Sequence, residues 1–317
     1  MKAMLKKMLQ SMASAAAAPM YQELIQRLSN CETEVRSLQS DVRTLKMKAN
    51  HPSFTKEAQI ALYLTYKDMA LRKVSPLPDF REVGFRCHSQ FEEDGILLFL
   101  FAVIGTTNKT AVEICAGNGI ECMTTNLILN HGWWGHLFDG DKRNVEAGTR
   151  FFRNSLDTFI YPPRFNHAWI TAENVNQVIR SSDVEGDIDL LSLDIDGMDY
   201  WVWRAIDCIM PRVVVCETHC IIGPDEALTV PYDPDFKITI PDYHSASLAA
   251  MTALASQKGY RLVGTHRYGF NAFFVRHGIA DDLLPAVAPS QCLNNPLVVE
   301  GRATRWPRVK DMKWQRV

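Results

Sequence analysis

The sequence has little that would hold the protein in a membrane or in an oxidising compartment. Its 317 residues contain no run that approaches the ~18 apolar residues needed to cross a bilayer. The eight cysteines form no CxxC pair, and several stand inside apolar runs, where they would pack as small hydrophobic side chains. These absences predict a protein without a membrane span, in a reduced, cytoplasmic compartment.

An excess of charge of one sign is missing too. The chain has 34 basic and 36 acidic side chains, which gives a net charge of −2. A protein whose main partner is nucleic acid usually carries a basic excess, so we expect no nucleic-acid partner. The 47% of hydrophobic residues and 22% of charged residues are ordinary for a soluble globular protein.

An apolar series with alternating spacings of three and four begins at Tyr21. Its members are Tyr21, Leu24, Leu28, Cys31, Val35, Leu38, Val42 and Leu45. The series occupies two of every seven positions, which is narrower than the stripe of a helix lying on a core, so it favours a coiled coil of two or three chains. A single amphipathic helix packed on the domain behind it is the alternative. We therefore expect residues 1–50 to form a helical segment that makes the protein a homo-oligomer.

The rest of the chain divides into a helical linker and an α/β domain. Pro52 disfavours helical geometry in the residue before it, and "TKEAQIALYLTYKDMALRK" then resumes a helix. Ser89 and Glu92 match a capping box in front of an apolar run. After this point short apolar strands alternate with helices, a pattern typical of α/β domains. We expect the linker over residues 51–88 and the domain over residues 89–317.

A glycine turn follows the first strand of this domain. Gly117 and Gly119 form the turn, and Asp139 closes the second strand twenty residues after Gly119. Glycines let a ligand approach the backbone, and an acid in this place can hold the hydroxyls of a ribose. The dinucleotide fingerprint requires a third glycine, and Cys122 stands at that position. Glu113 stands inside the first strand, where a carboxylate disfavours a pyrophosphate and suits a cationic, amino-acid-like or sulfonium ligand.

Two later apolar runs each end in a pair of polar residues. "DLLSLDID" ends in Asp194 and Asp196, and "RVVVCETH" ends in Glu217 and His219. Residues i and i+2 of a strand point to the same side, so each strand would present its two polar groups together.

Three interpretations of this quartet stay open. A divalent cation bound by the carboxylates and His219 would lower the pKa of a substrate hydroxyl. Oxygen ligands suit Mg²⁺ or Mn²⁺, and an imidazole favours a transition metal. Without a metal, a carboxylate or His219 would act as general base. In a purely structural role, Asp196 would cap the next helix and His219 would bond a backbone carbonyl.

Taken together, the motifs resemble the FkbM-like branch of the S-adenosylmethionine-dependent methyltransferases. They are "SQFEEDGIL", "VEICAGNGIECMTTNLILNHGWWGHLFDGD", "DLLSLDIDGMDYWVW", "RVVVCET", "VPYD" and "GFNAFFVR". The resemblance implies a Rossmann-like, seven-stranded class I methyltransferase sheet with helices on both faces, closed by a hairpin over "GTHRYGFNAFFVR". In such a sheet the strands that end at Asp194 and Glu217 are neighbours, and ligands bind outside the carboxyl ends of the strands.

The resemblance also implies which residues hold the cofactor. Those expected to bind S-adenosylmethionine are Gln90, Glu93, Asp94, Glu113, Gly117, Asn118, Gly119, Asp139, Gly140, Glu173, Asn174 and Asp194. Asp194 and His219 are the expected catalytic residues, and Asn271 and His244 are weaker candidates for polar contacts near the site. The sequence departs from the family pattern at Cys115, which replaces a glycine, and at His219, where relatives tend to have asparagine.

We predict an S-adenosylmethionine-dependent methyltransferase that methylates a sugar hydroxyl in a glycan or a secondary metabolite. The acceptor would be a small molecule or a glycan, and the coiled coil would hold the protomers together. A nicotinamide-dependent sugar oxidoreductase would use the same scaffold, but the missing third glycine disfavours it. A third class, a non-catalytic coiled-coil scaffold, would bind no cofactor, and the retained Glu113, Asp139 and Asp194 disfavour it.

Overall fold

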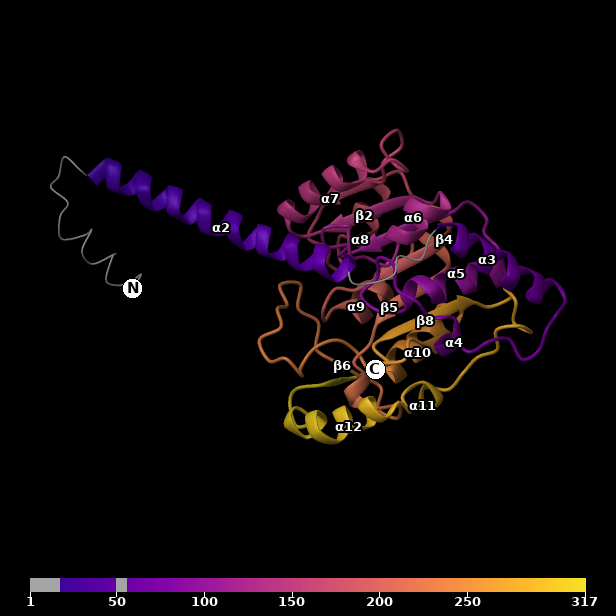
Figure 1. Cartoon of the computed structure of the whole chain (residues 1–317). Helices are drawn as coiled ribbons and strands as arrows, with labels where there is room; N and C mark the ends of the chain where they lie inside the picture. The colour runs from indigo at the N-terminus through magenta and orange to yellow at the C-terminus, as the bar shows by residue number, and fades with distance from the viewer. Residues whose placement is uncertain (1–17, 50–55) are drawn as a thin grey trace. The chain divides into compact units, whose positions relative to one another are not determined.

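The computed structural model describes residues 18–49 and 56–317, which belong to two compact units (Figure 1). The first unit lies within residues 1–54, and the second spans Thr55–Val317. None of the helices in the described part of the chain is both long and apolar enough to span a bilayer.

The first unit contains one helix, α2 (Ala18–Ala49). The predicted helix is therefore present. Its apolar series is exposed, because Leu24, Leu28, Val35 and Leu38 each have 50–61% of their surface accessible. The side chains of Tyr21, Val42 and Leu45, and the helix break expected at Pro52, lie outside the described residues.

The second unit is built on a seven-stranded sheet in the order β3-β2-β1-β4-β5-β8-β7. Neighbours from β3 to β5 are parallel, and β8 is antiparallel to both β5 and β7. The strands are β1 (Thr110–Ile114), β2 (Trp134–Asp139), β3 (Arg164–His167), β4 (Gly186–Leu193), β5 (Ile209–Glu217), β7 (Tyr260–Thr265) and β8 (Asn271–Arg276). This order confirms the predicted Rossmann-like methyltransferase sheet, including the neighbouring strands that lead to Asp194 and Glu217 and the final hairpin.

Helices cover both faces of the sheet, because alternate residues of its central strands point to opposite faces. Val213 and Val215 of β5 belong to one core, and Val214 and Cys216 belong to the other. The first core includes α3 (Lys56–Leu71), α4 (Phe80–Val83), α5 (Glu93–Ile104), α6 (Thr125–His131) and α7 (Lys142–Asn154). The second includes α8 (Val175–Arg180), α9 (Asp199–Ala205) and α10 (Leu248–Gln257).

The helix expected in the linker is part of this unit. α3 packs along α5, and the rings of Tyr66 and Phe99 meet edge to face with their centroids 5.1 Å apart. Phe80 and Val83 of α4 are buried in the same core. The compact unit therefore begins before residue 89, where the sequence suggested the domain boundary.

The capping box predicted from Ser89 and Glu92 is wrong. α5 begins at Glu93, and Glu92 makes no side-chain capping hydrogen bond. The hydroxyl of Ser89 instead donates to the carboxylate of Asp94, 3.0 Å away. Asp94 also accepts the backbone N–H groups of Cys87 and His88, so its charge draws this segment into a tight loop in front of α5.

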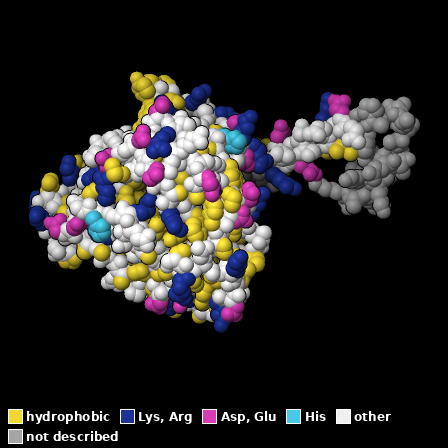
Figure 2. All heavy atoms as spheres, turned by 180° about the vertical axis from the view of Figure 1, so that it is seen from behind, with side chains coloured by type: hydrophobic (Ala, Val, Ile, Leu, Met, Phe, Trp, Pro, Cys, Tyr) yellow, Lys and Arg dark blue, Asp and Glu magenta, His cyan; other side chains and the backbone are white. Residues whose placement is uncertain are grey.

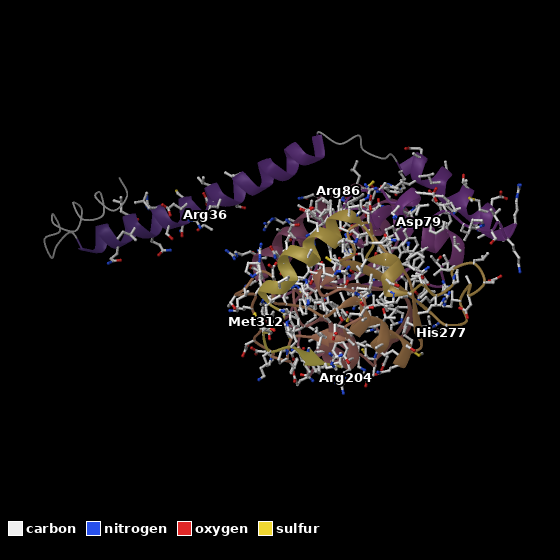
Figure 3. The ribbon with its side chains drawn as sticks, turned by 90° about the horizontal axis from the view of Figure 1, so that it is seen from below. Arg36, Asp79, Arg86, Arg204, His277 and Met312 are labelled. Carbon is white, nitrogen blue, oxygen red and sulfur yellow. The ribbon has the colours of Figure 1, made fainter. Side chains whose placement is uncertain are left out.

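Short elements lie in the connection after β5 and after the last strand of the sheet. These are η1 (Cys220–Ile222), β6 (Leu228–Thr229), α11 (Pro289–Cys292), α12 (Pro296–Arg305), η2 (Trp306–Arg308) and β9 (Gln315–Arg316). β9 pairs with β6 in a separate two-stranded sheet. Figure 3 shows α12, in yellow, on the near side of the second unit when it is viewed from below.

Candidate active site

The carboxyl ends of the parallel strands open onto a cavity of about 800 Å³. Its walls come from the turns after β1, β2, β4 and β5, from the segment after β3, and from residues 234–238. Open α/β sheets bind their ligands in this place, and the volume lies within the ~300–1,000 Å³ that is usual for small-molecule sites. Five acids are among the lining residues: Asp139, Asp141, Asp194, Asp196 and Glu217.

The turn after β1 leaves room for a ligand beside its backbone. Gly117 has a φ of 55°, and a Cβ built on it would meet no atom within 4 Å. Since Gly117 lines the cavity, that open space is available to a bound molecule. Gly119 has a different role, because a Cβ there would lie 2.8 Å from a ring carbon of Phe152. Cys115 also lines the cavity and adopts a left-handed φ of 64°, a conformation that glycine adopts without strain.

Asp139 stands at the end of β2 and is held by the glycine turn. Its carboxylate accepts the N–H of Gly117 at 2.9 Å, the N–H of Asp141 at 2.8 Å and the side-chain amide of Asn144 at 3.0 Å. These bonds fix the carboxylate at the cavity wall beside the open turn. The arrangement is suited to holding the two hydroxyls of a ribose.

Asp194, Asp196 and Glu217 meet at the floor of the cavity. Each offers a carboxylate oxygen, and the three oxygens lie within 4.8 Å of one another. Burial, followed by the charges of Asp199 and Asp196, raises the pKa of Asp194 well above its usual range. Burial and the charge of Asp194 raise the pKa of Glu217 in the same way. Three oxygen donors this close, with charges that oppose one another, can share a hard divalent cation or a proton.

The loop that carries two of these acids is shaped by Asp199, which the sequence reasoning missed. Asp199 is fully buried at the first position of α9 and accepts the N–H groups of Ile195 and Gly197 at 2.9 and 3.2 Å. The backbone turns sharply here, with a left-handed φ of 54° at Asp196. Asp196 does not cap α9, since the helix begins three residues later without a side-chain capping bond. The only sequence signal for Asp199 was an acid in the first turn of a helix.

Glu217 has a second contact that the sequence did not reveal. The hydroxyl of Ser245 donates to its carboxylate at 2.7 Å, and Nδ1 of His244 lies 2.9 Å from the same hydroxyl. Ser245 is fully buried and adopts a left-handed φ of 55°. A strained residue that holds an acid of the cavity is typical of a functional site.

His219 lies outside the group formed by the three carboxylates. Its ring is buried, and Nε2 lies 2.9 Å from the backbone carbonyl oxygen of Asp242. The ring of His244 is 4.2 Å away, between centroids. Burial and the neighbouring His244 lower the pKa of His219 to about 4, so the imidazole is neutral at physiological pH.

Glu113 sits beneath the start of α6. Its carboxylate accepts the N–H groups of Met123 and Thr124, both at 2.9 Å, and a short bond from the Thr124 hydroxyl. Such donors, at the entry to a helix, are the ones that hold the pyrophosphate in dinucleotide-binding folds. Here the protein's own carboxylate has taken them.

The residues expected to cover the cofactor divide between the cavity and the core. Gln90 is exposed and lines the cavity. Glu93 is buried and accepts a bond from the side-chain amide of Asn271 at 2.8 Å. Asn271 pairs with Glu217 across β5 and β8, so this bond lies directly behind the carboxylate group. Asp94 is buried within its own loop, as described above.

Three other expected residues brace loops around the cavity. Asn174 accepts the N–H of Thr171 at 2.8 Å and donates to the carbonyl of Trp169 at 2.9 Å. Glu173 is exposed, and its carboxylate accepts the hydroxyl of Tyr232. Asn118 accepts the N–H of Ile120 within the turn after β1.

The aromatic side of the cavity is formed by Trp169 and Phe236, for which the sequence carries no signal. Trp169 lies over Gly140, where an added Cβ would come within 2.9 Å of the indole. Its Nε1 donates to the carbonyl of Pro234 at 2.9 Å, which ties the segment after β3 to the loop at residues 233–241. Phe236 of that loop lies against Gly197. The cavity therefore combines an apolar, aromatic wall with an acidic floor.

Comparisons with known proteins give structural neighbours only. No family model and no curated protein matches the sequence. One neighbour is magnesium protoporphyrin IX methyltransferase from Synechocystis PCC 6803 with bound SAM, at 12% identity and a TM-score of 0.38, over 58% of this chain and 77% of that one. A methyltransferase from Clostridium acetobutylicum has 10% identity and a TM-score of 0.38, over 69% and 99% of the two chains. An O-methyltransferase family protein from Burkholderia thailandensis has 12% identity and a TM-score of 0.35, over 77% and 70%. Similarity at this level assigns no activity to this chain.

Proposed function

We propose that the protein is an S-adenosylmethionine-dependent methyltransferase of the FkbM-like kind. The observation that carries the proposal is the pairing, across one cavity, of the open glycine turn and Asp139 with the acidic floor of Asp194 and Glu217. A nucleoside ribose suits the first pair, and a positively charged sulfonium suits the second.

The residues present fit this cofactor. Asp139 would hold the ribose. The ribose would lie against the backbone of Gly117, in the open space that a Cβ would otherwise fill. Trp169 would offer an aromatic surface to the adenine, and Gln90 would lie at the mouth of the cavity. When bound, S-adenosylmethionine supplies the methyl group as an electrophile. Glu113, Asn118, Gly119, Glu173 and Asn174 would support these contacts through the turns they brace.

A dinucleotide fits less well at the same place. The N–H groups that would receive a pyrophosphate at the start of α6 already donate to Glu113. A nicotinamide cofactor would have to displace this buried carboxylate, which would lose its hydrogen bonds. This favours the methyltransferase over the oxidoreductase.

For the acceptor we propose a hydroxyl group of a sugar. The acceptor oxygen must lose its proton as it gains the methyl group, so a carboxylate near it has to act as base. Asp194, Asp196 and Glu217 meet at the floor of the cavity, and an ionised member of this group would take that proton. The ring of Phe236, which lies against Gly197, gives a sugar ring an apolar surface to lie against.

A divalent cation at the acidic floor would assist this step. Asp194, Asp196 and Glu217 provide three oxygen ligands, which suit Mg²⁺ or Mn²⁺. Such an ion would lower the pKa of a bound hydroxyl and orient it. We leave His219 out of this ligand set, because its Nε2 lies within hydrogen-bonding distance of the Asp242 carbonyl. Its role would be to support Glu217 through His244 and Ser245.

We also propose that α2 joins protomers as a coiled coil and that the protein works in the cytoplasm. In proteins most of the stability of a helix comes from packing its apolar face against another element. The exposed series on α2 gives a second copy a matching surface to cover.

Calorimetric titration of S-adenosylhomocysteine, and separately of NAD, into the purified protein tests the cofactor. We expect S-adenosylhomocysteine to bind and NAD not to. Asp139→Ala should raise the Kd for S-adenosylhomocysteine by about 10- to 100-fold, since it removes hydrogen bonds to a charged group. Asp187→Ala, a change in an exposed ion pair with Arg276, is the matched control and should leave the Kd unchanged.

Repeating the titration after chelation and with Mn²⁺ restored tests the cation. We expect Mn²⁺ titrated alone to give a heat of binding, and we expect the Asp194→Asn variant to give none. Binding of NAD in place of S-adenosylhomocysteine would end the methyltransferase proposal. If Mn²⁺ does not bind, the proposal that remains is a carboxylate acting as general base without a metal.

A further inference from the structure

The segment between α7 and β3 exposes an unusual number of large apolar side chains. Leu156, Phe159, Ile160 and Tyr161 have between 56% and 89% of their surface accessible. Figure 2 shows hydrophobic side chains gathered on a protrusion at the top of the second unit, seen from behind. Figure 1 draws the loop that follows α7 in this place. Exposed apolar groups grouped in this way mark an interaction site.

This tip is a folded turn. The N–H groups of Thr158 and Phe159 both donate to the carbonyl of Ser155, at 3.2 and 2.9 Å. The buried hydroxyl of Thr158 donates to the carbonyl of Phe152 at 2.6 Å, which ties the turn to the end of α7. Pro162 and Pro163 follow and have no N–H to desolvate. The tip therefore presents apolar side chains on a backbone that already satisfies part of its own hydrogen bonds.

Positive charge lies beside the tip. Residues 150–164 include three arginines against one acid. The ion pairs of the region are Lys56 with Asp157 and Arg164 with Asp183. They leave Arg150 and Arg153, exposed and one helical turn apart on α7, without an acidic partner among the described residues.

We propose that this tip, residues 156–161, docks the protein on an anionic lipid surface. Aliphatic and aromatic side chains that protrude on a folded turn can enter the boundary between headgroups and acyl chains, and Tyr161 brings the polar hydroxyl that suits this depth. Arginines beside the tip would face the negative headgroups. A fluid lipid surface accepts a convex apolar tip without a shaped pocket, whereas a protein partner would need one.

The docking surface lies away from the proposed active site. The tip precedes β3 and so stands at the amino end of the sheet, whereas the cavity opens at the carboxyl ends. A molecule docked by this tip would keep its cavity free for an acceptor on the other side. The inference does not depend on methyl transfer.

Sedimentation with vesicles tests the proposal. We expect the full chain to sediment with vesicles made of equal parts phosphatidylcholine and phosphatidylserine, and far less with phosphatidylcholine alone. Phe159→Ser combined with Ile160→Ser should weaken this binding by about tenfold or more, because two apolar side chains no longer leave water. Arg150→Gln with Arg153→Gln should weaken binding only to the anionic vesicles. The matched control, Leu297→Ser with Val299→Ser, changes two exposed apolar residues of α12 and should bind as the unaltered chain does.

Each alternative outcome overturns the proposal. Equal binding by the tip variant and the control would show that other residues contact the lipid. No sedimentation with either vesicle would show that the tip is not a lipid-docking surface. A tip variant whose mass in light scattering falls below that of the unaltered chain would show that the tip joins two copies of the protein. All the substituted side chains are exposed, and circular dichroism would verify that the variants fold.

Discussion

At the scale of single residues, the acids of the cavity floor depend on two buried partners, Asp199 close by in the sequence and Ser245 far from it. The expectation that these acids and His219 would lie together joined a local argument, the alternation along each strand, to the strand order that the resemblance implied. The three carboxylates meet, and His219 lies outside the group. Asp199 and Ser245 had no such signal. Ser245 meets Glu217 across 28 positions of sequence, in a contact that exists only once the loop before α10 is folded.

The contact between Ser245 and Glu217 predicts an effect on cation binding. Removing the hydroxyl frees one carboxylate oxygen of Glu217 and lets the group turn. Residues that orient metal ligands typically change metal affinity by ~10- to 100-fold when mutated. We expect Ser245→Ala to weaken Mn²⁺ binding by about that factor, measured by calorimetry, and to leave binding of S-adenosylhomocysteine unchanged.

Two further variants separate the hydroxyl from the backbone. Ser245→Gly also lacks the hydroxyl but accepts the left-handed φ without strain, so it should bind Mn²⁺ as weakly as the alanine variant. Ser182→Ala removes a buried hydroxyl that contacts His136, away from the cavity, and should bind Mn²⁺ as the unaltered chain does. Normal affinity in the glycine variant would show that backbone strain, rather than the hydroxyl, governs the site.

At the scale of elements, α5 packs closely against the backbone of the loop before it. The N–H of Gly95 donates to the carbonyl of Phe85 at 3.0 Å. A Cβ on Gly95 would lie 2.3 Å from both the nitrogen of Phe85 and the carbonyl oxygen of Val83. Only glycine allows the helix to come this close to the backbone of residues 83–85.

Gly95→Ala should therefore destabilise the second unit. Overpacking of this kind costs ~1–3 kcal/mol, and here the obstructing atoms belong to the backbone, which places the cost near the upper end. Urea unfolding measures the free energy of unfolding. Gly301→Ala is the control, because an added Cβ in α12 would meet its nearest atom at 3.8 Å and should stabilise by ~0.5–1 kcal/mol through helix propensity. Equal stability of the Gly95→Ala variant and the unaltered chain would contradict this packing argument.

Most of the elements could be predicted, because their signals are local. Apolar runs such as "RVVVC" became buried strands, and the alternation of strands and helices gave the α/β fold. The capping box failed because the helix begins only at Glu93, and the Ser89 hydroxyl bonds both the carboxylate and the backbone N–H of Asp94. Glu113 was placed in the first strand correctly, but its bonds to Met123 and Thr124 depend on how the long turn after β1 folds back. The sequence alone does not specify that path.

At the scale of the whole molecule, the first unit raises the question of assembly. α2 is a 32-residue helix, and the seam side chains of Leu24, Leu28, Val35 and Leu38 are each at least half exposed. Burying a side chain such as leucine contributes ~1.5–3 kcal/mol, so a second copy would gain several such contributions by covering the seam. Conformational entropy opposes that gain, and a series of several apolar positions is needed to overcome it.

Introducing charge into this seam tests the assembly. Leu28→Asp with Leu38→Asp places carboxylates in the centre of the proposed interface, where burial would leave them unpaired. We expect light scattering to give the mass of a dimer or a trimer for the unaltered chain and the mass of one chain for this variant. Gln26→Asp with Ser37→Asp adds the same charge at positions outside the seam and should keep the assembled mass. An unaltered chain that already has the mass of a single protomer would exclude the coiled coil and would leave the exposed stripe of α2 for another partner.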